Sequence, residues 1–343
     1  MTGRVRVLAA GFGGIGVPGG QDHQTDMYLP ALAADPRFEV AGVATAGEDP
    51  GRARAAAERY GVVCHESLDA ALRADGVDLV CLAAPYETRT EAITAVLEAG
   101  RHVLADKPLA PAAADAARLA ALADETGVVL VPAHHQRLGG VLRSVRGAVR
   151  AGRIGLPWNV QADLLVAGGE PAPGGELANL ALHPVDVVLA LLGLPVTRVY
   201  ACGGAAVPEG GHAPVTLLLD HERGVRSTIV CGRLPALRDV PPSAPVVHRY
   251  RISGSHGVVL ADALKPAADL HTTTGRTPVG TGRDTLAHLL DATWTAVTTG
   301  SAELTAWDAV RTGLVLEAAA ESLRTGRPAE PARDGEHAER SEG

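Results

Sequence analysis

Three neighbouring residues, Asp106-Lys107-Pro108, directly follow the apolar segment 102–105. This segment has the composition of a buried strand, so Lys107 would stand at the carboxyl end of a strand, with its backbone restrained by the following proline. Ligands of doubly wound α/β sheets bind at this edge. The sequence therefore predicts that Lys107 contacts a ligand, although an exposed surface position is the commoner place for a lysine.

A second group of polar residues recurs at helical spacing. Asn179, His183 and Asp186 lie four and three residues apart within the largely apolar segment 176–192. Residues at this spacing share one face of a helix. An imidazole on such a face can contact substrate or complete a structural hydrogen bond. We expect these three side chains to face the substrate.

Two adjacent histidines, His134 and His135, follow the predicted strand 128–132. Histidine pairs are common metal ligands, but no carboxylate or cysteine stands beside these two at the spacing of a zinc site. We therefore expect no metal, and we interpret the two histidines as structural or substrate-facing residues.

The glycine-rich segment 11–16 matches the pattern G-x-G-x-x-G directly after the apolar segment 5–10. Glycines at these positions allow a tight turn and let the backbone approach a pyrophosphate at a helix N-terminus. The alternative is a glycine-rich turn without a ligand, but the place after the first strand favours dinucleotide binding. The motif residues expected at the cofactor are Gly11, Phe12, Gly13, Gly14 and Ile15.

The end of the second predicted strand indicates which dinucleotide is bound. NAD enzymes usually carry an acidic residue there that binds the adenosine ribose 2′-hydroxyl, but Thr45 occupies this place, and Glu48 and Asp49 come only later. Without a carboxylate a 2′-phosphate would meet less repulsion, and Arg52 or Arg54 could reach it. The sequence therefore favours NADP over NAD.

The segment 18–26 is unusual for the place where the first helix should run. Its proline and paired glycines break helices. Either the helix starts late, near Met27, or the segment forms a loop over the cofactor or substrate.

Strands and helices alternate through residue 132, which indicates a parallel sheet with helices on both faces. The expected strands are 5–10, 38–44, 62–64, 77–83, 102–105 and 128–132, with helices at 29–34, 51–60, 68–73, 90–99 and 112–126. Later strands follow one another and indicate a mostly antiparallel, open sheet. They are expected at 159–166, 196–202, 215–220, 225–231, 246–253 and 258–262, with helices at 138–151, 176–192, 284–299 and 305–325. The predicted fold class is α/β: a doubly wound parallel sheet followed by a second α/β domain.

Composition excludes several classes of protein. The 343 residues are 46% apolar and 20% charged, which is too apolar for a disordered chain. The net charge is −8 at pH 7 without a basic stripe, and only 3% of residues are aromatic, so we expect no nucleic-acid partner. Four widely spaced cysteines, no signal sequence and no apolar membrane span predict a cytoplasmic protein that does not bind membranes.

Together these motifs resemble the Gfo/Idh/MocA oxidoreductases, which include glucose–fructose oxidoreductase and inositol dehydrogenase. The matching segments run in the family's order from residue 5 to residue 328: GFGGIG, VDLVCLAAP, EAGRHVLADKPLA, HHQR, AGRIGLP, GGELANLALHPVDVVLALLG and TAWDAVRTGLVLEAAAESLRTGRP. The resemblance implies a Rossmann domain over residues 1–132, a substrate and oligomerisation domain over 133–327, and a homodimer or homotetramer. The charged composition of 328–343 predicts a disordered tail.

The resemblance also implies roles for single residues. Lys107 matches the lysine of the family's E-K-P motif, with Asp106 in place of the glutamate, and would bind the reacting oxygen. His183 matches the histidine that acts as general acid/base. Asn179 replaces the usual catalytic aspartate, so it can hydrogen-bond a substrate hydroxyl but cannot take a proton.

Further positions are expected at the ligands by the same resemblance. Gln136 occupies a place that often faces substrate, and Arg89 stands where a histidine is common. Outside the glycine motif, the residues expected at the cofactor are Thr45, Ala84, Pro85, Asp106 and Lys107.

The implied function is an NAD(P)-dependent oxidoreductase that transfers a hydride between nicotinamide and a carbinol or carbonyl carbon of a sugar, cyclitol or related polar small molecule. One alternative is an imine reductase in a biosynthetic pathway, which the loss of the aspartate would fit because an imine needs a donated proton. Another is a catalytically inactive scaffold that binds nucleotide. The presence of both Lys107 and His183 argues against the scaffold.

Overall fold

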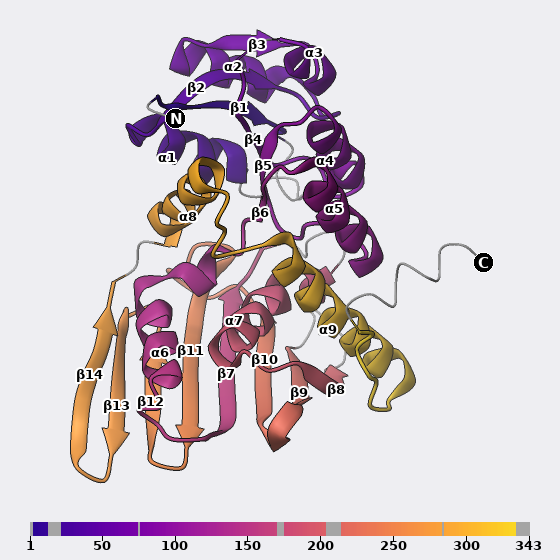
Figure 1. The fold of residues 1–343 in the computed structure, drawn as a ribbon. Coiled ribbons are helices and arrows are strands. Elements are labelled where there is room, and N and C mark those ends of the chain that lie inside the picture. Colours follow the sequence, from indigo (N-terminus) through magenta and orange to yellow (C-terminus); the bar gives the residue numbers. More distant parts are fainter. Residues whose placement is uncertain are drawn as a thin grey trace. The chain divides into compact units, whose positions relative to one another are not determined.

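A computed structural model describes residues 3–12, 22–74, 76–169, 175–203, 214–282 and 285–333. The chain folds into two compact units, whose elements are labelled in Figure 1. The first is formed by Met1–Ala133 and Leu286–Val310, and the second by His134–Thr285 and Arg311–Gly343. Each unit is built on a sheet of its own.

The first unit contains a six-stranded sheet in which every neighbouring pair of strands is parallel. In spatial order the strands are β3 (Val63–His65), β2 (Phe38–Ala44), β1 (Val5–Ala10), β4 (Leu79–Leu82), β5 (His102–Ala105) and β6 (Leu130–Pro132). The helices of this unit include α1 (Leu29–Ala34), α2 (Gly51–Tyr60), α3 (Leu68–Leu72), α4 (Arg89–Glu98), α5 (Ala113–Thr126) and α8 (Thr285–Thr299). Strand β4 is buried along its whole length, as in a sheet covered on both faces. The predicted doubly wound sheet is confirmed.

The strand order of this sheet reverses at β1, which lies between β2 and β4. Ligands of doubly wound sheets bind outside the carboxyl ends of the strands at such a point. Gly11 follows β1 directly, Ala83 follows β4, and Asp106 follows β5. The start of the glycine motif and the Asp106-Lys107 pair therefore share one edge of the sheet.

The second unit contains an eight-stranded sheet. In spatial order the strands are β14 (Gly275–Thr281), β13 (Ala267–Thr272), β12 (Gly257–Asp262), β11 (Ala244–Gly254), β7 (Pro157–Ala167), β10 (Arg226–Leu234), β9 (Val215–His221) and β8 (Val196–Gly203). All neighbouring pairs are antiparallel except β7 and β10, which are parallel. The predicted mostly antiparallel sheet is confirmed.

One face of the second sheet carries the core. Helices α6 (Gly140–Arg150) and α7 (Leu182–Leu192) pack on this face, and the later part of α9 (Ala306–Thr325) joins the same cluster. Alternate residues of β7, namely Val160, Ala162 and Leu164, are buried in it. The opposite face is open within this unit, so its side chains are polar or partly exposed.

The sequence predicts neither β13 nor β14. Both strands are short, and β14 forms the edge of the sheet with glycine, threonine and arginine in place of apolar residues. The tail was predicted to be disordered from residue 328, but its first residues are ordered, because Ala329 and Val199 exchange two backbone hydrogen bonds of 2.8 Å. Residues 334–343 of that tail lie outside the described residues.

Residues 286–310 belong to the first unit, whereas the sequence places them in a continuous domain 133–327. Arg37 shows how the segment is held. Its guanidinium binds Asp291 of α8 at 2.6 Å and lies 5.6 Å from the ring centroid of Trp294. These contacts join residues more than 250 positions apart in the chain, so no local pattern predicts them.

Candidate active-site residues

Asp106 lies buried directly after β5, and its carboxylate is hydrogen-bonded to two side chains. Its Oδ1 accepts a hydrogen bond from the Tyr28 hydroxyl at 2.7 Å, and Nδ1 of His23 lies 3.0 Å from Oδ1 and 2.9 Å from Oδ2. Tyr28 ends the π-helical segment Gln24–Tyr28, and His23 precedes it. Asp106 is 1% exposed and Lys107 is 4% exposed, so the two opposite charges are held away from bulk water.

Arg89, the first residue of α4, ties the ends of two strands together. Its guanidinium donates to the Ala84 carbonyl at 2.8 and 3.2 Å and to the Pro108 carbonyl at 2.8 Å. It also lies 3.8 Å from Oδ2 of Asp106. Arg89 is 1% exposed, and it fixes the segment that contains the cis peptide bond between Lys107 and Pro108.

The charges around Asp106 decide its protonation state. Burial alone would raise the pKa of its carboxyl, but the charges of His23, Arg89 and Lys107 outweigh burial and hold that pKa well below its ordinary value. Asp106 is therefore ionised and can only accept hydrogen bonds. It follows that Nδ1 of His23 carries a hydrogen and donates it to Asp106.

The backbone at Gly11 leaves no room for a side chain. Its φ is 81°, and a Cβ there would lie 2.6 Å from the carbonyl carbon of Ala83 and from the nitrogen of Ala84. The described start of the glycine motif thus packs directly on the end of β4, as a dinucleotide-binding turn requires. Three predicted cofactor residues of the motif lie outside the described residues: Gly13, Gly14 and Ile15.

The Glu48 side chain places its carboxylate at the end of β2, where the sequence shows no acidic residue. Its Oε1 accepts a hydrogen bond from the Phe12 N–H at 2.8 Å, and its Oε2 accepts one from the Ala46 N–H at 3.0 Å. The Phe12 N–H therefore points toward an anionic acceptor, which is the environment that a dinucleotide-binding turn provides. Thr45 is buried, and its hydroxyl donates to the Glu66 carbonyl at 3.3 Å.

Other predicted cofactor residues lie at the same edge of the first sheet. Ala84 is buried and Pro85 is half-buried after β4. Nη1 of Arg52 lies 3.3 Å from the Phe12 carbonyl and 3.6 Å from Oδ2 of Asp22. The described residues of this edge fit a dinucleotide, because Gly11 makes a turn that only a residue without a side chain allows and Arg52 lies at the same turn.

The second unit holds the remaining predicted residues. The helix predicted over 176–192 begins with a π-helical segment, Leu177–Ala181, and continues as α7. Asn179 lies in the π-helical segment and His183 near the start of α7, and each is 7% exposed. The ring centroid of His135 lies 5.7 Å from that of His183. The fold of this unit thus brings together two histidines from separate elements.

Asp186 is enclosed by protein partners. Its Oδ1 lies 2.6 Å from Nδ1 of His134, and Arg137 donates to Oδ1 at 2.5 Å and to Oδ2 at 2.7 Å. The Thr312 hydroxyl lies 3.4 Å from Oδ1. Burial alone would raise the pKa of Asp186, but Arg137 and His134 outweigh it and lower that pKa. Both oxygens are thus occupied by protein groups, and Asp186 anchors the turn that carries His134 and Arg137.

Gln136 presents an acceptor that the described protein does not satisfy. Its Oε1 is buried without a hydrogen-bond partner among the described residues, and the same holds for Nε2 of His134. A buried polar atom without a partner costs about 1–3 kcal/mol unless water or a ligand supplies one. A polar ligand with hydroxyl donors would satisfy such acceptors, which agrees with the predicted substrate-facing position of Gln136.

The sequence misses His248, a buried histidine of β11. Its Nε2 lies 3.0 Å from the Tyr250 hydroxyl, and the side chain is close enough to His135 for the two imidazoles to repel when charged. Burial is the main cause that lowers the pKa of His248 to about 4, so this imidazole is neutral at neutral pH. His248, Tyr250 and Ile252 are buried at alternate positions, and this period of two is the signal that could have revealed His248.

Arg233, in β10, contacts three separate segments of the second unit. Its guanidinium, which is 5% exposed, binds Glu176 Oε1 at 3.0 Å, the Gly168 carbonyl at 2.5 Å and the Ser243 hydroxyl at 2.9 Å. A Cβ at Gly169 would lie 2.4 Å from Oγ of Ser243 and 2.9 Å from Nη1 of Arg233. We call these contacts the Arg233 clasp; they tie the start of the π-helical segment to the ends of β7 and β10.

Comparison with known proteins decides the family. The model of the oxidoreductase family with an NAD-binding Rossmann fold matches residues 5–134, and the model of the GFO/IDH/MocA C-terminal domain matches residues 142–260. The dTDP-3,4-didehydro-2,6-dideoxy-α-D-glucose 3-reductase of Streptomyces violaceoruber is 36% identical over 273 residues, which are 74% of each chain. This chain belongs to the Gfo/Idh/MocA oxidoreductases.

Two further proteins are similar to the chain. The enzyme of the same name from Actinomadura kijaniata is 32% identical over 232 residues, 64% of this chain and 68% of that one. The crystal structure of GenD2 from gentamicin A biosynthesis, in complex with NAD, superposes with a TM-score of 0.80 at 25% identity and covers 97% of this chain and 98% of that one. The protein is therefore an NAD(P)-dependent oxidoreductase, and neither the imine-reductase nor the scaffold alternative gains support.

Neither a metal-binding cluster nor a membrane-spanning helix is present in the part of the chain that the structure describes. No group of three or more histidine, cysteine, aspartate or glutamate side chains is arranged to hold a metal ion. None of the described helices has the length and apolar character needed to cross a membrane.

Proposed function

We propose that this oxidoreductase reduces a keto group of a nucleotide-linked deoxysugar, as the names of its two relatives describe for those enzymes. The observation that supports this most strongly is the buried, ionised Asp106 beside Lys107 at the ligand-binding edge of the sheet. A lysine ammonium beside such a carboxylate can hold the oxygen of a carbonyl while a hydride reaches its carbon.

The roles of the residues follow from what the reduction requires. Bound nicotinamide supplies the hydride, and one proton must then reach the oxygen to complete the alcohol. Lys107 hydrogen-bonds that oxygen and stabilises the negative charge that develops on it. His183 delivers the proton as general acid, a role for which an imidazole suits neutral pH.

Asn179 fits the direction of reduction. Its amide can donate to or accept from a substrate hydroxyl, but it cannot remove a proton from one. Oxidation of an alcohol needs a base at that hydroxyl, whereas reduction of a ketone needs an acid. We propose that Asn179 and Gln136 bind substrate hydroxyls, and that Asp186 positions the His134–Arg137 turn without touching the substrate.

The cofactor preference rests on Glu48. The sequence favours NADP because Thr45 is not acidic, but the Glu48 carboxylate reaches the same edge, where it accepts from Phe12 and Ala46. A carboxylate there repels a 2′-phosphate and can accept a hydrogen bond from a 2′-hydroxyl. We therefore propose that NAD is the better cofactor, although the exposed Arg52 lies near the same turn.

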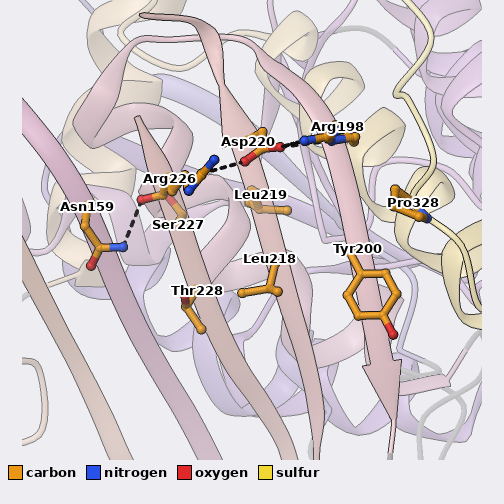
Figure 2. A pocket seen from close by; sticks show the side chains of 10 residues that line it. All are labelled: Asn159, Arg198, Tyr200, Leu218, Leu219, Asp220, Arg226, Ser227, Thr228 and Pro328. Carbon is orange, nitrogen blue, oxygen red and sulfur yellow. Dashed lines mark hydrogen bonds and ion pairs between the residues drawn. The ribbon is translucent and has the colours of Figure 1, made fainter. Parts of the chain in front are cut away.

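The open face of the second sheet suggests how copies of the chain associate. Figure 2 shows side chains that line a concave region of about 530 Å³, in which Asp220 binds Arg198 at 2.5 Å and Arg226 at 3.1 Å. Tyr200 is 36% exposed and Leu218 is 46% exposed on the same face. We propose that two copies pair through this face, because association would bury these apolar side chains.

The homodimer proposal is tested by sedimentation of the wild-type chain and of Leu218→Arg. The wild type should sediment as a dimer or larger oligomer and the variant at a lower mass. Val63→Arg, at a 60% exposed valine of the first unit, is the matched control and should leave the mass unchanged. A monomeric wild type, or a Leu218→Arg variant of unchanged mass, refutes the proposal.

The compartment proposed for the protein is the cytoplasm. All four cysteines, Cys64, Cys81, Cys202 and Cys231, are free thiols, and burial raises the pKa of Cys231 to about 12. Free, protonated thiols are typical of a reducing compartment. Labelling by a fused compartment-specific biotin ligase tests this placement, and labelling only outside the cytoplasm contradicts it.

The function is tested with purified protein, reduced NAD or NADP, and a dTDP-linked 3-keto deoxysugar generated in the same vessel. We expect oxidation of the nicotinamide that depends on the keto sugar, with NADH the better donor. In Glu48→Gln the preference for NADH should shrink. Turnover of an imine and not of the keto sugar would support the alternative reductase, and an absence of turnover on both would support the scaffold.

A further inference from the structure

His23 belongs to the segment 18–26, whose role the sequence leaves open. Of this segment, residues 22–26 are described, and they form a turn closed by its own side chains. Asp22 accepts from the Gln24 N–H at 3.1 Å and from the Thr25 hydroxyl at 2.6 Å, while Asp26 accepts from the Asp22 N–H at 3.0 Å. The turn thus holds the backbone of His23 in a fixed place.

The side chain of His23 is directed at Asp106 and at no other described polar group. Its Nδ1 lies within 3.0 Å of both carboxylate oxygens, and its ring meets that of Tyr28 edge-on, with centroids 6.2 Å apart. The side chain is 12% exposed. The imidazole therefore binds the Asp106 carboxylate from a largely buried position.

We propose that His23 is a positioning residue for Lys107 and acts on it through Asp106. The inference rests on the proposed function, in which Lys107 holds the reacting oxygen. A carboxylate bonded by His23 on both oxygens cannot rotate freely, so the adjacent Lys107 faces a counter-charge in a fixed place. The pairing of an oriented imidazole with a buried carboxylate is the arrangement by which carboxylates and histidines orient each other in other enzymes.

Loss of the His23 hydrogen bond should reach Lys107 as an electrostatic effect. The Asp106 carboxylate is contacted by His23, by the Tyr28 hydroxyl and by the Arg89 guanidinium, and the charge of Lys107 also acts on it. Without the His23 donor this carboxylate could turn, and the field that it exerts on the Lys107 ammonium would change.

The chain offers a direct spectroscopic test, because Lys107 and Lys265 are its only two lysines. Lys265 is exposed and serves as the internal reference when the full-length protein is labelled with [ε-13C]lysine. The Lys107 signal reports the charges around its ammonium, so it should differ between the wild type and a variant that lacks the His23 donor, whereas the Lys265 signal should not. This measurement needs neither cofactor nor substrate.

Three variants test whether the donor at His23 positions Lys107. His23→Asn keeps a donor near the position of Nδ1, so the Lys107 signal and kcat should stay near their wild-type values. His23→Leu removes the donor, so the signal should move and kcat should fall about 10- to 100-fold, the size expected for one hydrogen bond to a charged group, with KM for the sugar little changed. Tyr28→Phe removes the other hydrogen bond to Asp106 but leaves the His23 donor in place, so it should move the Lys107 signal less than His23→Leu does.

The two possible failures are distinguishable. A His23→Leu protein with the wild-type Lys107 signal and wild-type kcat overturns the proposal for His23. A Lys107→Met protein with wild-type kcat overturns the proposed function, whatever the signals of the His23 variants show. An unchanged Lys265 signal and circular dichroism spectrum establish that each variant is folded.

Discussion

Replacement of Asp186 by asparagine should destabilise the second unit by about 3–5 kcal/mol, the usual cost of removing one partner of a buried ion pair. The side chain of Asp186 is 2% exposed and that of Arg137 is 5% exposed. Arg137 and His134 direct their donors at the carboxylate over 2.5–2.7 Å. An amide offers these donors one acceptor oxygen in place of two, and it leaves the Arg137 guanidinium buried without its counter-charge.

Thermal unfolding followed by circular dichroism measures the effect. In a unit of this size 1 kcal/mol corresponds to about 2–4 °C in Tm, so Asp186→Asn should lower Tm by about 6–20 °C. Glu321→Gln is the matched control, because Glu321 also binds an arginine, Arg324, but at an exposed place in the same unit. Its loss should change stability by less than about 1 kcal/mol.

The pH dependence of the stability difference between the wild type and Asp186→Asn provides a second test. The pKa of Asp186 is lower in the folded protein than its ordinary value, so its contribution is complete above the unfolded value of about 3.9 and is lost as the pH falls through the folded pKa. The difference in free energy of unfolding between wild type and Asp186→Asn should therefore be constant near neutral pH and shrink in acid. Equal stability of the two proteins at neutral pH, or a loss no larger than that of Glu321→Gln, would refute the reasoning.

Three other predictions concern the two units separately. Arg233→Leu should open the Arg233 clasp and raise KM for the sugar by about tenfold or more with a smaller effect on kcat, and steady-state kinetics showing the reverse split would contradict this. His183→Ala should lower kcat by about 10²- to 10⁴-fold and remove an ionisation from the pH profile, while Asn179→Ala should mainly raise KM; a His183→Ala protein with the wild-type profile would show that another group supplies the proton. Gly11→Ala should weaken binding of NAD in a calorimetric titration and lower stability by about 1–3 kcal/mol, since the new Cβ would lie 2.6 Å from Ala83 and Ala84; unchanged binding would place the dinucleotide elsewhere.

The sequence predicted those features of the fold that depend on residues close together in the chain. The alternation of strands and helices predicted the first sheet because parallel strands covered on both faces are uniformly apolar. Gly11 and Lys107 could be singled out from the sequence alone. Gly11 begins a glycine-rich segment directly after an apolar one, and Lys107 follows closely after another apolar segment. The edge strand β14 was missed because it is exposed and rich in glycine and threonine. Its neighbour β13 was missed because its only buried residues are Ala268 and Leu270, which is too weak an apolar signal.

The partners of the candidate residues could not be predicted, because tertiary contacts alone determine them. His23 and Asp106 are 83 positions apart in the chain, and nothing in the segment 18–26 indicates which carboxylate it meets. Glu48 lies beyond the end of β2, and nothing in the sequence indicates that its carboxylate accepts hydrogen bonds from the Phe12 and Ala46 N–H groups. Asp186 has the correct helical spacing to accompany His183, but the charges that enclose it come from His134 and Arg137.

The transfer of deuterium tests the central claim most directly. The full-length protein would be incubated with nicotinamide dinucleotide deuterated at C4 on the transferred face and with a dTDP-linked 3-keto deoxysugar, and the sugar product would be examined by mass spectrometry and proton NMR. The proposed function predicts one deuterium on the new carbinol carbon with the wild type, and little product with Lys107→Met. A reduced sugar without deuterium on that carbon, or no reduced sugar from the wild-type protein, would contradict it.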